Sequence, residues 1–161
     1  MMIVVVIIAV LVTVAIVAYT RYLRSSRIVG EKVFAAKIQS MQETYFQRFG
    51  TYCDVTGGTP YPATVPQTAV VFAPAAGNWA LIGARPESGE THASWTVVAS
   101  TATAHAVSSG PPWAQAIMTA TTGVPWYAIR AQMDIDANGS PYTEIFSTSQ
   151  KPQPWTVNEN N

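Results

Sequence analysis

A short run in the C-terminal third of the chain places oxygen-bearing side chains at alternate positions. Asp134, Asp136 and Asn138 are followed by Gly139, as in the first half of a calcium-binding loop, where a glycine makes the sharp turn. Glu144 lies one position before the place that a bidentate glutamate takes in a complete loop. The run therefore predicts either a calcium site formed by Asp134, Asp136, Asn138 and Glu144 or a hairpin turn that uses these residue types for backbone reasons.

The remaining nucleophiles and bases do not form a catalytic motif. Histidine occurs only at His92 and His105, with Ser94 and Ser108 nearby, and no Gly-x-Ser-x-Gly segment accompanies them. The one cysteine, Cys53, excludes an internal disulfide and a cysteine-based zinc site. The sequence also has no phosphate-binding glycine loop. We therefore expect a protein that is not an enzyme and has no resident cofactor apart from the calcium considered above.

The first twenty residues carry no charge, and Thr13 is the only polar residue before Tyr19. Twenty residues of α-helix cover about 30 Å, which is the thickness of the hydrocarbon core of a bilayer. Because every side of this helix would be apolar, the segment predicts a membrane span rather than an amphipathic helix on a soluble core. A cleaved secretory signal peptide is the alternative, but its basic residues would precede the apolar run, whereas here they follow it.

The helical pattern continues beyond the apolar run. Residues 21–49 contain no proline and only one glycine, Gly30. Apolar residues recur there at helical spacing, at Ile28, Phe34, Ile38, Met41, Tyr45 and Phe49. We expect one helix over residues 1–49, about 70 Å long, that is apolar over 1–20, amphipathic over 21–49 and ended by Gly50.

The composition changes at residue 50. All eleven prolines and all five tryptophans lie in the segment 50–161, which predicts a globular, β-rich domain. Residues 50–68 have the composition of an extended surface loop, and residues 151–161 of a frayed or surface-lying tail. The best strand candidates are Trp79–Ala84, Ser94–Ser100, Trp126–Ile135 and Tyr142–Ser147.

The clearest strand signal is the segment Trp126–Ile135, where apolar residues alternate from Tyr127 to Ile135. Asn138-Gly139 then predicts a hairpin with the next strand. A small antiparallel sheet packed on the amphipathic half of the helix would bury the apolar side of both. The order of a long helix and then strands predicts an α+β fold.

The formal net charge of zero conceals an uneven distribution. Residues 1–20 carry no charge, residues 21–48 carry six Lys and Arg against two Glu, and residues 49–161 carry three against seven acidic residues. The chain therefore combines a segment of +4 with a segment of −4. Neither the total nor the acidic head points to a nucleic acid partner.

The N-terminal run is similar to that of a known family. Met2-Ile3-Val4-Val5 and the apolar residues that follow resemble the N-terminal helix of bacterial type IV pilins and of the pseudopilins of type II secretion. The resemblance extends to the start of the head and implies a pilin fold. Through it, the residues assigned to assembly are Met2, Ile3, Val4, Val5, Ile7, Ile8, Leu11, Tyr19, Arg21, Tyr22, Arg24 and Arg27.

The sequence departs from the family pattern in two places. The basic leader of the family, its peptidase site and the glutamate of its Phe-Thr-x-x-Glu start would all lie before Met1, so we expect a natural chain with additional upstream residues. Val17 stands about where many members have a proline, and no kink is expected there. Some pseudopilins hold calcium in the head, which agrees with the half-loop at Asp134.

The resemblance implies a structural subunit that rests in the inner membrane and then self-associates into a helical filament with the help of pilus or secretion assembly machinery. A type IV pilus would support adhesion, motility or DNA uptake at the cell surface, and a pseudopilus would act in the periplasm. A minor pilin, a type II pseudopilin and a single-span anchored binding domain remain alternatives. Taken alone, Arg21, Arg24 and Arg27 would keep the head in the cytoplasm, whereas the pilin interpretation requires the opposite orientation.

Overall fold

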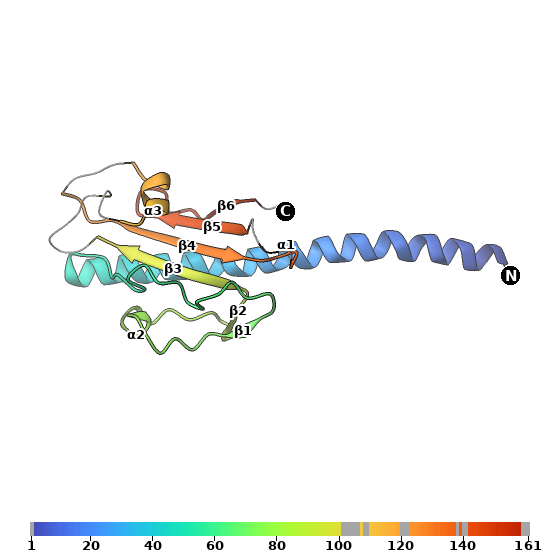
Figure 1. The fold of residues 1–161 in the computed structure, drawn as a ribbon, viewed down its shortest axis with the longest axis horizontal. Helices are drawn as coiled ribbons and strands as arrows, with labels where there is room; N and C mark the ends of the chain where they lie inside the picture. Colours follow the sequence, from blue (N-terminus) through green and yellow to red (C-terminus); the bar gives the residue numbers. More distant parts are fainter. Residues whose placement is uncertain are drawn as a thin grey trace. The chain divides into compact units, whose positions relative to one another are not determined.

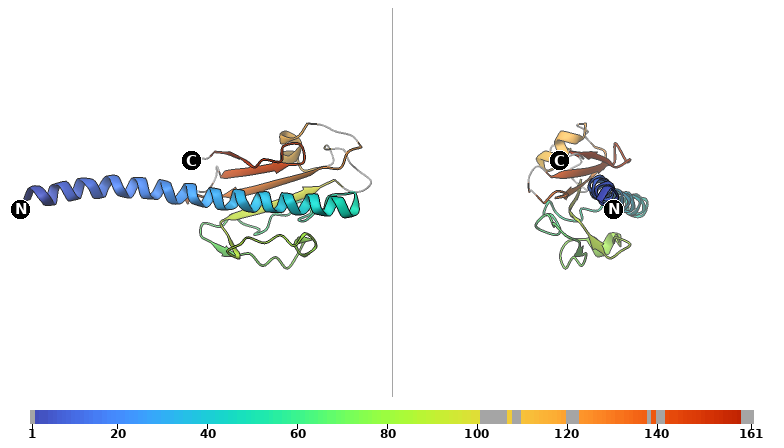
Figure 2. Two further views of the ribbon diagram at one scale, coloured as in Figure 1. Left: turned by 180° about the vertical axis from the view of Figure 1, so that it is seen from behind. Right: turned by 90° about the vertical axis from the view of Figure 1, so that its right-hand side faces the viewer.

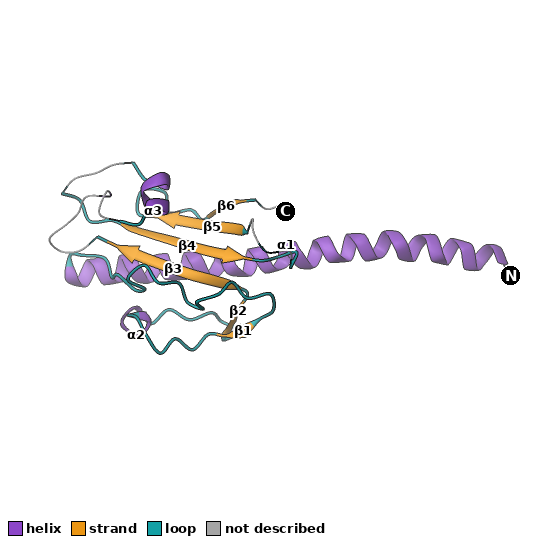
Figure 3. Cartoon of the chain, in the orientation of Figure 1, coloured by secondary structure: helices purple, strands orange, loops and turns teal. Residues whose placement is uncertain are grey.

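The computed structural model describes residues 2–100, 107, 110–119, 123–137, 139 and 142–158. The chain divides into two compact units, Met1–Gly30 and Glu31–Asn161. Figures 1 and 3 show its helices and strands. In chain order they are α1 (Met2–Phe49), β1 (Val70–Val71), α2 (Trp79–Ile82), β2 (Glu90–Thr91), β3 (Ala93–Ala99), α3 (Pro112–Ile117), β4 (Tyr127–Met133), β5 (Thr143–Thr148) and β6 (Trp155–Val157).

Helix α1 confirms the prediction of one long N-terminal helix. It ends at Phe49 because Gly50 takes a left-handed conformation, with φ of 69°, that glycine adopts without steric cost. The Gly50 N–H donates to the carbonyl of Phe46 at 2.8 Å. Gly30 is the only glycine within α1, and a side chain at that position would meet no atom within 4 Å.

The main sheet is antiparallel and has the strand order β3-β4-β5-β6. Strands β3, β4 and β5 correspond to the predicted strands Ser94–Ser100, Trp126–Ile135 and Tyr142–Ser147, with ends that differ by one or two residues. Met133 pairs with Thr143, so the β4–β5 register is centred on position 138, as the predicted hairpin requires. Asn138 itself lies outside the described residues. The α+β fold class is therefore confirmed.

One face of the sheet packs on α1, within the unit that begins at Glu31. Figure 2, seen from behind, shows this part of the helix crossing β3 and β4. The Phe34 ring meets the Trp95 ring edge-on at 4.8 Å between centroids, and Ala35 and Ile38 have no exposed surface. The alternating residues of β4 predicted to be apolar, from Tyr127 to Met133, are all buried on this face.

The buried stripe of α1 differs from the predicted one at its C-terminal end. Met41 and Tyr45 are only half-buried and Phe49 is 63% exposed, while Gln42 is fully buried. The positions that face the sheet continue at helical spacing from Glu31 through Ile38 to Gln42. Two polar residues occupy core positions there because both find hydrogen-bond partners in the head, which sequence periodicity does not reveal.

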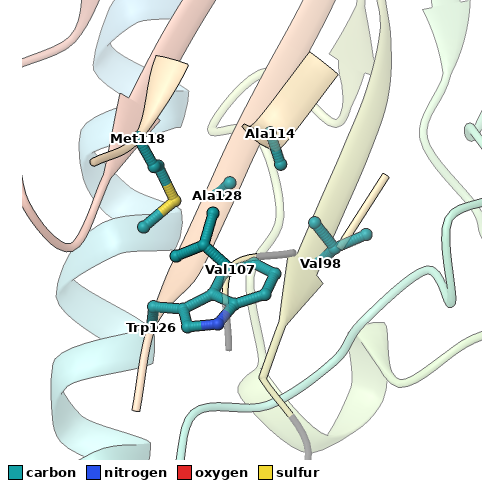
Figure 4. Packing of buried hydrophobic residues seen from close by; sticks show 6 residues of the cluster. All are labelled: Val98, Val107, Ala114, Met118, Trp126 and Ala128. Carbon is teal, nitrogen blue, oxygen red and sulfur yellow. The ribbon is translucent and has the colours of Figure 1, made fainter. Parts of the chain in front are cut away.

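The opposite face of the sheet is partly covered by α3, which the sequence analysis did not predict. Ala114 and Met118 pack over Val98 and Ala128, with Trp126 closing the cluster (Figure 4). The signal for this helix was Pro112 at its first position, where proline is favoured because that N–H has no helical partner.

The prediction of a strand over Trp79–Ala84 is wrong. Residues 79–82 form the short helix α2, whose buried residues Trp79 and Ile82 are three positions apart, a helical spacing. Gly83 ends the helix with φ of 66°. The Trp79 ring packs edge-on against Phe72 at 5.0 Å, and Phe72 in turn packs against Phe34 at 5.4 Å. An aromatic cluster therefore extends the core beneath β1 and β2.

Two further expectations need correction. Residues 50–68 contain no helix or strand, but Cys53 and Val55 are buried, and Tyr61 forms a bridge with Trp95, so this segment is not purely a surface loop. The C-terminal tail is not frayed over its described part, because Trp155–Val157 forms β6 and pairs with β5. Pro152 and Pro154 precede this strand, so they remove no hydrogen-bond donor from its ladder.

Candidate assembly surface

The apolar part of α1 exposes side chains on every side. Successive helical residues are turned by about 100°, so neighbouring positions face different directions. Ile7, Ile8 and Val10 nevertheless expose 54%, 55% and 58% of their surface, and Leu11 exposes 63%. Such a continuous apolar surface is larger than monomeric soluble proteins usually expose, and surfaces of this kind are typical of segments that contact a membrane or another protein.

The polar groups of this segment are satisfied within the helix. The Thr13 hydroxyl donates to the carbonyl of Val10 at 2.7 Å, and the backbone groups of a helix are paired with one another. Among the described residues, α1 is the one helix long and apolar enough to cross a membrane, and none of its most apolar window is buried. A membrane span and a signal sequence both fit this segment.

The structure places all of the predicted assembly residues on α1. The exposed members of the set are Ile3, Val4, Val5, Ile7, Ile8, Leu11, Tyr19, Arg21, Tyr22, Arg24 and Arg27. The remaining member is Met2, the first residue of α1. Burying an isoleucine or leucine of this kind contributes about 1.5–3 kcal/mol, so covering this surface would be strongly favourable.

Glu31 fixes the second part of α1 to the head, a role that the sequence analysis did not detect. Its carboxylate accepts a hydrogen bond from the backbone N–H of His92 at 2.7 Å and another from the Thr91 hydroxyl at 3.0 Å. The residue is only 6% exposed. Burial raises the pKa of the Glu31 carboxyl, and the hydrogen bonds to His92 and Thr91 oppose that shift.

Gln42 makes a second polar attachment, eleven residues further along the same face of α1. Its side-chain amide donates to the carbonyl of Cys53 at 2.7 Å, and its side-chain oxygen accepts from the N–H of Cys53 at 2.9 Å. One side chain thus satisfies both backbone groups of a buried residue. Together, Glu31 and Gln42 fix the rotation and the axial position of this part of α1 on the sheet.

The predicted calcium loop is only partly described. Asp134 is 8% exposed, one carboxylate oxygen accepts from the N–H of Gly139 at 3.2 Å, and the other has no hydrogen-bond partner. Glu144 instead accepts from Arg130 and from Gln132. Asn138 lies outside the described residues, and no group of three His, Cys, Asp or Glu side chains in the described ranges is placed to hold a metal. The calcium site stays a prediction.

Two of the other reactive residues, Cys53 and Ser94, are buried. Burial, together with the charge of Asp54, raises the pKa of the Cys53 thiol to about 11, which makes it a poor nucleophile at neutral pH. The Ser94 hydroxyl donates to the carbonyl of Pro62 at 2.6 Å. His105 and Ser108 lie outside the described residues.

The long apolar N-terminal helix and the four-stranded antiparallel sheet on which its second part packs form a pilin-like architecture. No protein-family model, curated protein or solved structure matches the chain.

Proposed function

We propose that this chain is the structural subunit of a type IV pilus filament and assembles through the apolar part of α1. The observation that carries the proposal is the exposed apolar surface on all sides of residues 3–16, joined in one helix to a sheet-bearing head. Lipid and neighbouring apolar helices provide surroundings of similar polarity. A helix of this kind can therefore leave a membrane for a helical bundle at small cost.

In this proposal the subunit rests in the inner membrane before assembly and becomes part of a surface pilus afterwards. Its partners are other copies of itself and the machinery that extracts subunits from the membrane. Its activity is assembly, and we propose no catalytic step for it. Adhesion, motility or DNA uptake would then be properties of the filament.

Three alternatives remain. Two of them share the architecture and also assemble, and the third does not require assembly. A type II secretion pseudopilin or a minor pilin would have the same fold and a different filament or copy number. A single-span anchored binding domain would have the same membrane helix, but it would stay monomeric in the membrane.

The test compares two substitutions that each replace an exposed aliphatic residue by aspartate. Ile8→Asp places a charge in the apolar part of α1, where the side chain is 55% exposed. Leu81→Asp places the same charge on the surface of the head, where the side chain is 64% exposed. The full chain is produced in a bacterium with a pilus assembly system, and sheared filaments are measured by electron microscopy and immunoblotting.

We expect Ile8→Asp to abolish filaments and Leu81→Asp to leave them unchanged, because a charge in an apolar helix bundle or membrane costs several kcal/mol. Monomeric membrane protein without filaments in the unaltered chain would favour the anchored binding domain. A reporter fusion that places the head in the cytoplasm would contradict the pilus proposal.

We also propose Asp134 as a ligand of calcium in the head, because one oxygen of this buried carboxylate has no hydrogen-bond partner among the described residues. Calcium prefers carboxylate oxygens. Calcium addition should raise the melting temperature of the unaltered protein and leave that of Asp134→Asn nearly unchanged. Equal melting temperatures of the unaltered protein with calcium and with chelator would exclude the site.

A further inference from the structure

Three arginines that follow the apolar segment form an exposed basic stripe, here called the collar: Arg21, Arg24 and Arg27. Residues three apart lie next to each other on a helix surface, so the three guanidinium groups lie along the same side of α1. All three residues are exposed. No ion pair involving them occurs among the described residues.

The two glutamates of α1 do not neutralise the collar, because the head uses both. Glu31 accepts from Thr91 and His92 in a buried position. Glu43 accepts from the Tyr52 hydroxyl at 3.3 Å. Among the described residues the collar therefore keeps its full positive charge, at the end of the exposed apolar segment.

Most acidic side chains of the head are also engaged. Asp54 accepts from the N–H of Gly57 at 3.0 Å, Glu144 accepts from Arg130 and Gln132, and Asp136 also has an interaction. The remaining described carboxylates of the head, apart from the buried Asp134, belong to Glu87 and Glu90. Both are exposed, and no side-chain partner is recorded for either of them among the described residues.

Glu87 and Glu90 lie in one turn, residues 86–90, which is stabilised by hydrogen bonds within the turn. The N–H of Gly89 donates to the carbonyl of Pro86 at 3.1 Å, and the Ser88 hydroxyl donates to the carbonyl of Glu90 at 3.0 Å. These hydrogen bonds do not involve the carboxylates of Glu87 and Glu90, so both carboxylates stay available to a partner. Within the described part of the chain, three cations in one stripe and two anions in one turn therefore lack an ion-pair partner.

We propose that the collar of one copy binds the turn 86–90 of a second copy. The inference rests on the proposed filament and names a polar contact within it. The contact is heterologous, since two different surfaces of identical chains meet, and such contacts extend into an open helical filament when the rotation between copies does not close a ring. Charge complementarity favours this occupant and fixes the register between copies, while the apolar helices supply non-directional attraction.

The first test is a charge exchange in the full chain. Arg24→Glu with Arg27→Glu, and separately Glu87→Lys with Glu90→Lys, should each lower the yield of filaments at least about tenfold, which corresponds to about 1.4 kcal/mol. The combined four-fold variant should restore the yield. Arg48→Glu, at an exposed position near the end of α1, is the matched control and should have little effect.

A second measurement keeps the proposal testable if the altered collar impairs membrane insertion. Arg24→Cys and Glu87→Cys are combined in one chain and treated with a short bismaleimide, while Cys53 stays inert because it is buried and its thiol pKa is raised to about 11. We expect a ladder of cross-linked oligomers from the double variant. Each single variant should remain largely monomeric, because a heterologous contact brings two different positions together.

The outcomes separate this inference from the filament proposal. Filaments without cross-linking and without rescue by the charge exchange would overturn the inference and leave the filament proposal intact. Loss of filaments from the collar variant alone, with no effect at Glu87 and Glu90, would assign the collar to anionic lipid headgroups and also overturn it. If the unaltered chain forms no filaments and the variant with both Arg24→Cys and Glu87→Cys forms no cross-linked oligomers in membranes, both proposals fail.

Discussion

The two parts of α1 are the same secondary structure in opposite surroundings. Residues 3–16 expose apolar side chains on every side, and the one polar side chain among them bonds to its own helix. The part from Glu31 onward buries one stripe against the sheet and includes two polar residues in that stripe. The first part of α1 thus offers an apolar surface without a preferred side, whereas the second part has polar contacts that fix its position on the sheet.

In the first part nothing distinguishes one side of the helix from another, so any apolar neighbour can cover it. In the second part a rotation about the helix axis would leave the Glu31 carboxylate and both backbone groups of Cys53 without partners. Unpaired buried polar groups are costly. The second part therefore has one position, whereas in the proposed filament the first part would exchange lipid for protein.

The largest difference should appear on removing apolar volume from each part. Ile38 is fully buried, so Ile38→Ala should lower the free energy of unfolding of the head by about 2–5 kcal/mol, through lost burial and a cavity. Ile8→Ala removes the same atoms from an exposed position and should leave the free energy of unfolding of the head unchanged. Denaturant unfolding of the full chain in detergent, followed by tryptophan fluorescence, measures both; equal losses would contradict the comparison.

A smaller loss is expected at the polar attachment of Gln42. Gln42→Leu keeps a side chain of similar size but leaves the N–H and carbonyl of Cys53 unpaired, which should cost about 1–3 kcal/mol. Gln47→Leu, at an exposed position of the same helix, is the control and should change little. If both variants unfold at the same denaturant concentration as the unaltered protein, Gln42 does not hold the helix.

Glu31 should make the stability of the head depend on pH. Its folded-state pKa is raised above the 4.5 of the unfolded chain, so between these two values the folded protein holds a proton that the unfolded chain has released. Stability is then greatest at the acid end of this window and falls as the pH rises through the folded-state pKa. Glu31→Gln should flatten that decline, measured as urea midpoints from pH 4 to pH 8, whereas Glu87→Gln should preserve it.

The smallest effect is expected at Gly30, where the two compact units meet in the sequence. A side chain there would meet nothing within 4 Å, so Gly30→Ala should stabilise the helix by about 0.5–1 kcal/mol. The reverse change in the packed part, Ala36→Gly at an exposed position, should destabilise it by a similar amount. Helical content during thermal unfolding, measured by circular dichroism, tests the pair; a loss of stability in Gly30→Ala would show that glycine is required there.

Patterns confined to one element could be predicted from the sequence. The long helix, its end at Gly50 and the strands β3, β4 and β5 follow from apolar periodicity, the absence of proline and turn residues. The helix α2 was missed because four residues are too few to separate the spacing of Trp79 and Ile82 from a strand pattern. The edge strand β6 was missed because the prolines just before it, Pro152 and Pro154, suggested a tail.

The contacts between distant elements could not be predicted. Glu31 and Gln42 look like ordinary surface residues of an amphipathic helix, and only the folded head supplies His92 and Cys53 as their partners. The same holds for Arg27 of the collar, because its potential partner four residues further along α1, Glu31, accepts from Thr91 and His92 instead. The exposed apolar segment, in contrast, was visible in the sequence because it needs no partner within the chain.

The separation of Glu31 from its partners has a consequence for the order of events during synthesis. Glu31 and His92 are 61 positions apart in the chain, so the residues that hold α1 on the sheet are translated long after the apolar segment. An N-terminal segment leaves the ribosome first. In the proposed function, residues 3–20 would be available for insertion into a bilayer while the head is still incomplete, and the sheet would close on the helix afterwards.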